Sequence, residues 1–366
     1  MTDPQVIALN DSPLRRDVDR QPDLLTALAA RSEAFVTTGL QRLQPGIGGR
    51  VFVTGCGDGF FAAESVRAFA ERLGLDWRPI SALDMVLAAR RLTPADRVIA
   101  ISMSGNVDRT VEAAQAVQAA GTPLVALVNS SSGGRLGLLA VARVSLDIDD
   151  IAPFLCGTSS YTLTLFALMA LAAGAAGAHA VPDTEPLAAM QKVALAVCDQ
   201  VLPIIALPSG VRLLSAGADR GTVAYGAAKL VELTRIPAWS GDLEEFAHSQ
   251  YWSMPITDLV VVVASDAALA QYANDTCGAL ADLGVATLAV DTPAGPVAHA
   301  THRITLPSCD AVLAPLVFAL PMQLLAAGLA RRSGLDPDTR LHLKSDGIRF
   351  RVSRMLTRRS LLGTGA

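Results

Sequence analysis

The sequence predicts an α/β protein built from two tandem copies of one unit, each a parallel sheet flanked by helices. Two observations carry this prediction. Short apolar runs bounded by Gly/Ser turns alternate with amphipathic helical stretches, a pattern that favours parallel strands joined by helices. With an offset of about 161 residues, the stretch 51–69 also aligns with 212–230, and 96–105 aligns with 258–267.

Each predicted strand is a short apolar run that ends near a small or polar turn residue. In the first copy these runs are RVFVTG (50–55), RVIAIS (97–102), PLVALV (123–128) and VARVSLDI (141–148). In the second copy they are VRLLSAG (211–217), DLVVVVAS (258–265), VATLAV (285–290) and HRITLP (302–307). We expect an N-terminal segment at 1–35, a first domain at 36–190, a second domain at 191–345 and a basic tail at 346–366.

The composition argues against several classes of protein: nucleic-acid-binding, disulfide-bonded, zinc-binding and exported proteins. The chain has 366 residues and a net charge of −4, so it offers no basic field for nucleic acid. Its five cysteines lie far apart, which indicates buried thiols rather than disulfides or a zinc site. The polar N-terminus has no apolar export signal. We therefore expect a cytoplasmic protein that needs no metal or cofactor.

One uncharged segment, 151–182, is long enough to span a bilayer. Its second half is dominated by Ala and Gly, and it lacks flanking Lys/Arg and an aromatic belt. We expect instead a helix buried in a domain or subunit interface, and no membrane association.

The stretch SMSGNVDRT (102–110) follows a predicted strand and opens a helix, where backbone N–H groups commonly hold anions. A simpler interpretation is that Ser104 only caps that helix. At the matching strand end the second copy has Ala264 and Asp266, and an Asp would repel phosphate. Any anion site of this kind is expected in the first copy only.

Several spaced motifs resemble the sugar isomerase (SIS) domain family in its double-SIS arrangement, with two tandem flavodoxin-like SIS subdomains. The resemblance runs from about residue 17 to residue 345. Its motifs are GCGDGF (55–60), SMSGNV (102–107), KLVE ending at Glu232, EEFAH ending at His248, and RLHLKS containing Lys344. His248 follows Glu232 by 16 residues, the spacing seen in that family, and only three lysines occur in the chain.

The resemblance implies three catalytic roles. Glu232 would move a carbon-bound proton between C1 and C2, a task suited to a carboxylate with a raised pKa. His248 would assist ring opening, reaching across a shared site in a homodimer. Lys344 would form an imine with the open ketose or hydrogen-bond the enediol oxygen. The alternatives are a surface Glu232 paired with Lys229, a helix-capping His248 and a solvated Lys344.

The resemblance also implies a set of substrate-binding residues: Gly57, Asp58, Gly59, Ser102, Ser104, Asn106, Thr110, Ser130 in the loop 129–134, and Thr158. Some positions depart from the family pattern. Gly59 replaces a hydroxyl, Met103 replaces Gln, and Asn106-Val107 replaces Glu-Thr. Asp58 would repel phosphate unless it turned away or paired with Arg109. The phosphorylation state of the sugar therefore stays open.

The expected function is an aldose–ketose isomerase or an amino-sugar deaminase or deglycase that acts through an enediol or enolamine. No glutaminase domain precedes the motifs in this sequence, so glutamine-dependent amination is disfavoured. A non-catalytic module that senses sugar phosphates is the alternative. The tail 346–366 either frays, adds an edge strand through IRFRV, or packs on a partner subunit.

Overall fold

A computed structural model describes residues 12–130, 132–153, 155–177 and 181–362. Residue 131 of the predicted 129–134 loop and the outermost residues of both predicted terminal segments, 1–11 and 363–366, lie outside the described part. The chain forms two compact units. The first-sheet unit comprises Leu24–Asp149, Ser160–Thr184 and Leu343–Ala366; the second-sheet unit comprises Met1–Asp23, Asp150–Ser159 and Glu185–His342.

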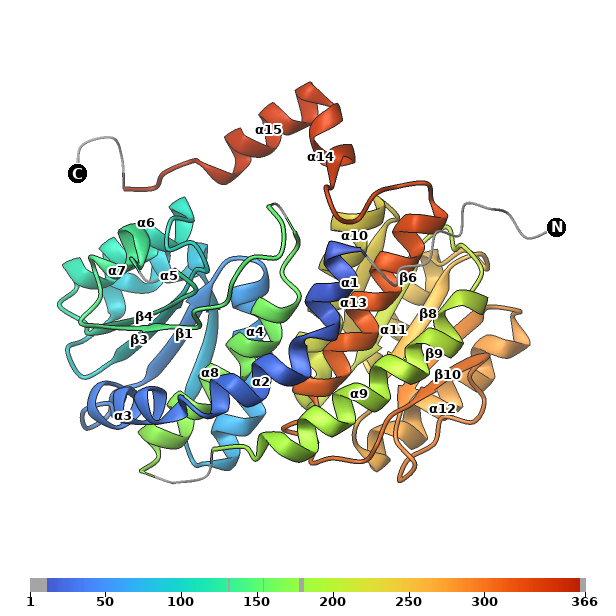
Figure 1. Cartoon of the computed structure of the whole chain (residues 1–366), viewed down its shortest axis with the longest axis horizontal. Coiled ribbons are helices and arrows are strands. Elements are labelled where there is room, and N and C mark those ends of the chain that lie inside the picture. Colours follow the sequence, from blue (N-terminus) through green and yellow to red (C-terminus); the bar gives the residue numbers. More distant parts are fainter. Residues whose placement is uncertain (1–11, 131, 154, 178–180, 363–366) are drawn as a thin grey trace. The chain divides into compact units, whose positions relative to one another are not determined.

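The first-sheet unit contains a five-stranded parallel sheet in the order β2-β1-β3-β4-β5. Its strands are β1 (Val51–Gly55), β2 (Trp77–Ser81), β3 (Arg97–Ile101), β4 (Leu124–Val128) and β5 (Ala142–Ser145). Its helices are α3 (Ser32–Arg42), α4 (Asp58–Arg72), α5 (Ala82–Ala88), α6 (Asp108–Ala119), α7 (Gly134–Gly137), α8 (Ser159–Ala175) and α15 (Gly347–Thr357). Helices α5, α6 and α7 cover one face, with α3, α4 and α8 on the other (Figure 1).

The second-sheet unit repeats this plan, with the order β10-β9-β8-β6-β7. Its strands are β6 (Val211–Ser215), β7 (Ala238–Asp242), β8 (Leu259–Val263), β9 (Ala286–Asp291) and β10 (His302–Thr305). Its longer helices are α9 (Thr184–Val201), α10 (Arg220–Thr234), α12 (Ala267–Asp282) and α13 (Pro315–Arg332), and its shorter ones are α1 (Pro13–Asp19) and α11 (Leu243–His248). Helices α2 (Gln21–Ala29) and α14 (Leu341–Ser345) lie where the chain passes between units. Read from opposite ends, both sheets have the strand order of flavodoxin, which confirms the predicted fold class.

Two strands, β2 and β7, were absent from the sequence prediction. Both are edge strands with mostly half-exposed side chains, so their sequences WRPIS and AWSGD lack a long apolar run. An edge position tolerates Pro79 and Gly241 because one side of the strand makes no ladder hydrogen bonds.

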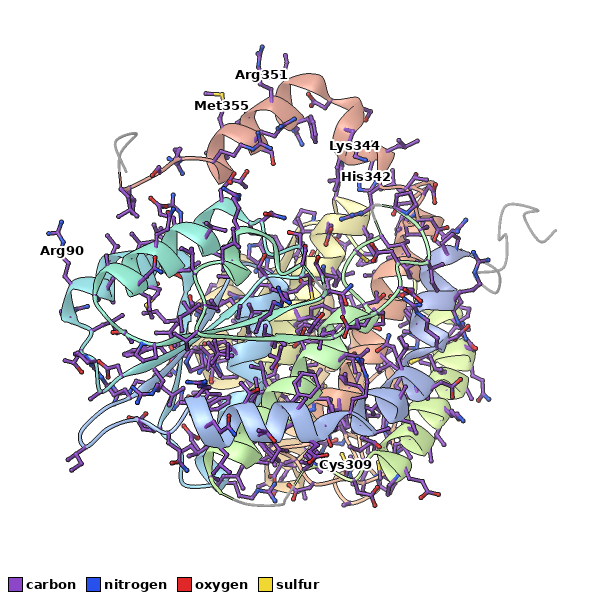
Figure 2. All side chains as sticks on the ribbon, turned by 60° about the vertical axis from the view of Figure 1, so that its left-hand side comes forward. Arg90, Cys309, His342, Lys344, Arg351 and Met355 are labelled. Carbon is purple, nitrogen blue, oxygen red and sulfur yellow. The ribbon has the colours of Figure 1, made fainter. Side chains whose placement is uncertain are left out.

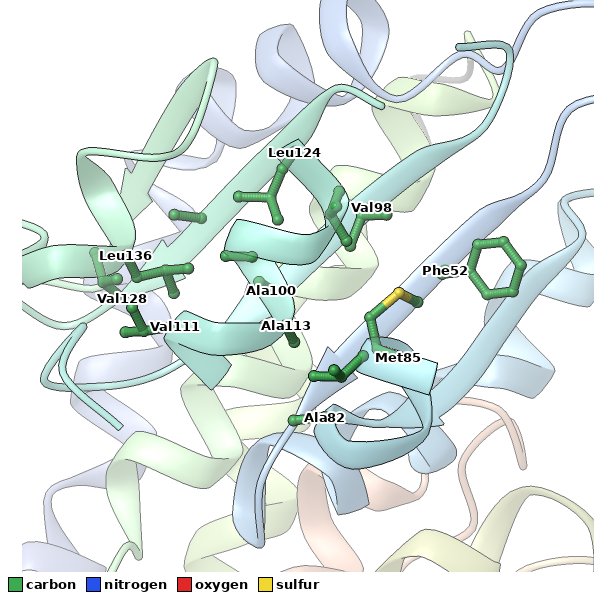
Figure 3. Close-up of a cluster of buried hydrophobic side chains, with 14 residues drawn as sticks. Phe52, Ala82, Met85, Val98, Ala100, Val111, Ala113, Leu124, Val128 and Leu136 are labelled. Carbon is green, nitrogen blue, oxygen red and sulfur yellow. The ribbon is translucent and has the colours of Figure 1, made fainter. Parts of the chain in front are cut away.

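The core of the first-sheet unit lies between the central strands and helices α5 and α6. Phe52, Val98 and Leu124 from the strands meet Met85 and Val111 from the helices (Figure 3). Burial of such side chains contributes roughly 1.5–3 kcal/mol each to folding, so this face anchors the loops at the strand ends.

The uncharged segment 151–182 forms the buried helix α8, as expected, and most of its side chains are inaccessible to solvent. Helix α3 packs closely on it, because a Cβ added at Gly174 would lie 2.0 Å from the carbonyl oxygen of Val36. Among the described residues, the helix long and apolar enough to cross a membrane is instead Thr184–Ile204. That helix carries Lys192 and Asp199, and Asp199 pairs with Arg15 at 2.5 Å.

The C-terminal tail forms the helix α15, so the edge-strand alternative for this segment is wrong. Asp346 caps the helix by accepting a hydrogen bond from the Arg349 N–H. The residues after it return to α6, where Ser360 donates to the Glu112 carboxylate at 2.8 Å.

Candidate active site

The loops after β1 and β3 meet at the point where the strand order of the first sheet reverses. Gly57 and Gly105 there have φ of +53° and +66°, a conformation that favours glycine. A Cβ at Gly105 would lie 2.0 Å from the carbonyl oxygen of Gly133, so the loop after β3 touches the loop after β4. Ser102 follows β3 and is 4% exposed, and its Oγ has no hydrogen-bond partner among the described residues. This hydroxyl remains available to a ligand.

Other predicted binding residues build the loop itself. The Ser104 Oγ accepts a hydrogen bond from the Asn106 N–H, and the Asn106 side chain binds the Ser104 carbonyl and the Arg135 N–H. Ser130 Oγ lies 2.8 Å from Ser132 Oγ. These contacts fix the shape of the loop.

Thr110 is fully buried on α6, and its Oγ1 donates to Cys56 Sγ at 3.6 Å. Gly59 lies on α4, where a Cβ would come within 3.1 Å of the Ile101 side chain, so a larger residue would crowd β3. Asp58, the first residue of α4, is half-buried. Arg109 ion-pairs with Glu112 and donates to the Arg359 carbonyl, which ties it to the C-terminal tail.

Thr158 lies in the second-sheet unit, where its hydroxyl donates to the Asp17 carboxylate of α1. The same carboxylate accepts hydrogen bonds from the N–H and hydroxyl of Ser159. Thr158 is 1% exposed, so its side chain stabilises the start of α8 in this structure.

Glu232 lies near the end of α10 and holds two cations. Lys229, one turn earlier, donates to Oε2 at 2.7 Å, and Arg340 donates to Oε1. The side chain of Glu232 is 25% exposed and that of Lys229 is 4% exposed. The predicted pairing with Lys229 is therefore present, with Lys229 buried and Glu232 half-buried rather than fully exposed.

The pKa of Glu232 departs from the sequence expectation. Burial raises the pKa of its carboxyl, but the attraction of Lys229 and Arg340 outweighs burial, so the pKa lies below its ordinary value. The expectation of a raised pKa is wrong, because the sequence did not reveal that a second cation, Arg340, reaches the same carboxylate. Near neutral pH Glu232 is ionised, the form that a base requires.

His248 is the last residue of α11, and its side chain is 66% exposed. Its Nε2 lies 3.0 Å from Glu244 Oε1, so its contact is with its own helix. Lys344 lies half-buried on α14, close to His342 on the same short helix (Figure 2). The contacts of Glu232 described above thus include neither His248 nor Lys344.

Sequence reasoning missed Arg340 and His342 as neighbours of Glu232. His342 Nε2 lies 2.9 Å from the Glu232 carbonyl oxygen, and Arg235 donates to the His342 carbonyl. Arg340 also donates to the Leu155 carbonyl at 3.1 Å. Both residues belong to the RLHLKS motif that contains Lys344, so the motif itself could have indicated them as site residues. Among the described residues, no group of three or more His, Cys, Asp or Glu side chains is arranged to hold a metal ion.

The chain is similar in sequence to known proteins. The sequence model of the SIS domain family matches residues 48–174. Glutamine–fructose-6-phosphate aminotransferase (isomerizing) of Caulobacter vibrioides is 24% identical over 361 residues, covering 90% of this chain and 56% of that protein. The chain thus spans about half the length of the curated relatives it matches.

Solved structures share the fold across nearly the whole chain. Tagatose-6-phosphate ketose/aldose isomerase of Escherichia coli superposes with a TM-score of 0.74 at 19% identity, covering 92% of this chain and 96% of that one. Glucosamine-6-phosphate deaminase of Thermotoga maritima gives a TM-score of 0.74 at 17% identity, covering 89% and 97%. At these identities the likeness establishes the fold.

Proposed function

We propose that this chain is a double-SIS enzyme that isomerises, deaminates or deglycates a phosphorylated sugar through an enediol or enolamine. The observation that carries the proposal is Glu232, a largely buried carboxylate kept ionised by Lys229 and Arg340. Such a group is an available base, and solvent does not compete for it as it would at the surface.

The lowered pKa of Glu232 suits a proton that is removed and returned. The carboxylate abstracts the proton beside the carbonyl carbon, and the two cations then favour its release again. Because protonated Glu232 is a stronger acid than an ordinary glutamic acid, it readily delivers the proton to the neighbouring carbon of the enediol. Arg340 acts through Glu232 and is a positioning residue in this scheme.

His248 and Lys344 complete the proposed reaction. His248 transfers the proton that opens the sugar ring, and Lys344 forms an imine with the ketose or donates to the enediol oxygen. The exposure of His248 supports a site shared between two subunits, since its imidazole is accessible to a second copy. We accordingly propose a homodimer that acts in the cytoplasm.

A phosphorylated substrate is supported by the loops after β1 and β3. The unpartnered Ser102 hydroxyl and the N-terminus of α4 both offer donors to an anion. Asp58, beside them, weakens a dianion site, so we expect lower phosphate affinity than the family pattern would give.

A sensing module without turnover is the second candidate, and the same cluster favours it. Both oxygens of Glu232 are already engaged by cations, as in a purely structural ion-pair network. In that case the chain would bind a sugar phosphate, and Glu232 would serve only to join α10 to the segment around Arg340.

Exchange of the enolisable proton with solvent deuterium, at C2 of an aldose or 2-amino sugar and at C1 of a ketose, is followed by NMR and separates the two candidates. Aldoses, ketoses and 2-amino sugars are tested with and without a 6-phosphate, using wild type, Glu232→Gln and Glu33→Gln, an exposed carboxylate on α3. The enzyme predicts exchange that Glu232→Gln abolishes and Glu33→Gln retains. Sugar phosphates that raise the melting temperature equally in all three proteins without exchange would contradict it.

A further inference from the structure

A cavity of about 550 Å³ lies at the carboxyl ends of β6, β7 and β8, inside the second-sheet unit. Strand order reverses between β6 and β8, the usual place for a ligand in an open parallel sheet. The volume is that of a pocket for a small molecule. None of the proposed catalytic residues lines it.

The wall of this cavity is acidic and apolar. Four carboxylates line it, Asp219, Asp242, Glu244 and Asp266, and no described lining residue is a lysine or arginine. Outside the lining, Arg220 lies 3.6 Å from Asp242 and His248 contacts Glu244. Asp219 and Asp266 make no ion pair among the described residues. Leu243, Leu269 and the ring of Tyr272 supply apolar surface.

One carboxylate of this wall, Asp219, has a buried oxygen that lacks a hydrogen-bond donor among the described residues. Its side chain is 1% exposed, and Oδ2 accepts hydrogen bonds from the Ser265 N–H and Oγ at 3.0 and 2.7 Å. Its other oxygen, Oδ1, is buried without a hydrogen-bond partner in the described part of the chain. A buried carboxylate oxygen without a hydrogen-bond donor is unfavourable, so a donor from a ligand, directly or through one ordered water, would be stabilising.

The N-termini of α11 and α12 at this cavity are closed to anions, whereas that of α10 has no side-chain cap from a described residue and has the carboxylate of its N-cap residue Asp219 beside it. Asp242 caps α11 by accepting from the Glu244 and Glu245 N–H groups, and Asp266 caps α12 by accepting from Ala268 and Leu269. The donors that would bind a phosphate are therefore occupied by carboxylates of the chain itself. A ligand here must bring positive charge or hydrogen-bond donors.

We propose that this cavity binds a small organic ammonium ion, whose cationic donors face Asp219 and Asp266 and whose apolar body packs on Leu243 and Leu269. The apolar wall favours an organic cation over a metal ion. No metal-type cluster of carboxylates occurs among the described residues, which agrees with that choice. The site is separate from the proposed sugar chemistry and holds whether or not Glu232 is a base.

Calorimetric titration of the full chain with benzylammonium at pH 7.5 tests the proposal. We expect one site per chain, binding at least about tenfold tighter than neutral benzyl alcohol, since the isosteric alcohol lacks the charge. Asp219→Asn is expected to weaken benzylammonium at least about tenfold, whereas Asp275→Asn, an exposed carboxylate on α12, retains it.

A second variant locates the ligand without altering charge. Ala268 lines the cavity and is exposed, so Ala268→Trp is expected to fill the space and abolish binding. Equal affinity for benzylammonium and benzyl alcohol, or undiminished binding to both Asp219→Asn and Ala268→Trp, would overturn the site. Glu232→Gln binds benzylammonium as wild type does, so a failure of this site is distinguishable from a failure of the proposed function.

Discussion

Replacing Asp219 by asparagine should stabilise the protein, although the residue is fully buried and hydrogen-bonded. Burial raises the pKa of Asp219 from 3.8 to about 6, and the hydrogen bonds from Ser265 only partly offset it. The shift is about two pKa units, and each unit corresponds to about 1.36 kcal/mol. The ionised carboxylate therefore destabilises the folded state by about 3 kcal/mol at pH 7.5, and the amide removes that charge.

The direction of the Asp219 pKa shift determines how the stability of the protein depends on pH. Because the pKa is higher in the folded state, the folded protein binds the proton more tightly, and stability falls as pH rises from about 4 to about 6. The gain from Asp219→Asn is thus about 3 kcal/mol at pH 7.5 but about 1 kcal/mol at pH 4.5. Such a stabilising substitution is characteristic of positions kept for binding rather than for folding.

Urea denaturation at the two pH values measures this gain as a higher midpoint at an unchanged slope. Asp275→Asn is the matched control, since its exposed carboxylate should change stability by less than about 0.5 kcal/mol. Equal stability of wild type and Asp219→Asn at pH 7.5, or a gain that is the same at both pH values, would refute the assignment of an uncompensated charge.

Three further substitutions test the sugar chemistry and the loop. Arg340→Met removes one cation from Glu232 and so raises its pKa; the acid limb of the C2-proton exchange rate should move to higher pH, and an unmoved limb would count against Glu232 as the base. Ser102→Ala should raise KM for phosphorylated sugars while unfolding free energy changes by less than about 1 kcal/mol, because the hydroxyl makes no hydrogen bond in the described chain. Gly105→Ala should lower the unfolding free energy by more than about 2 kcal/mol. Gly121 has a similar φ but open space around it, so the control Gly121→Ala should lower the unfolding free energy by only about 1 kcal/mol. Equal losses in the two variants would exclude the steric contact at Gly105.

The sequence predicted the strands well where burial requires a continuous run of apolar residues. All eight predicted strands are present. Six of them are central strands, each covered on both faces, and these read as apolar runs; β5 and β10 are edge strands. The missed strands β2 and β7 are edge strands whose sequences, WRPIS and AWSGD, contain no continuous apolar run and whose side chains are mostly half-exposed. Those two strands nevertheless begin 161 residues apart, at Trp77 and Ala238, which is the offset of the predicted repeat.

The candidate site was predictable in its motifs but not in its electrostatics. Glu232 and Lys229 are neighbours on one helix, so helical spacing alone pairs them. Arg340 lies 108 residues later in the chain, and no local rule brings it to Glu232. Likewise Asn106 and Thr110 fall in a binding motif, yet the Asn106 side chain bonds the Ser104 carbonyl of its own loop and the Thr110 hydroxyl donates to Cys56 after β1. Long-range contacts decide which polar residues remain available to a ligand.

The two copies share a topology, but the ligands proposed for them have opposite charge, and the difference lies in their helix caps. In the first sheet, Ser81 caps α5 through a neutral hydroxyl, which accepts from the Asp84 N–H at 3.1 Å. At the corresponding place in the second sheet, Asp242 caps α11 through a carboxylate. After β3 the chain turns through Gly105 and leaves a free Ser102 hydroxyl, whereas after β8 Asp266 caps α12 and Ser265 binds the buried Asp219. A cap of either kind stabilises its helix by a similar amount, so the fold tolerates the exchange, while Asp242 and Asp266 add negative charge at the strand ends of the second sheet.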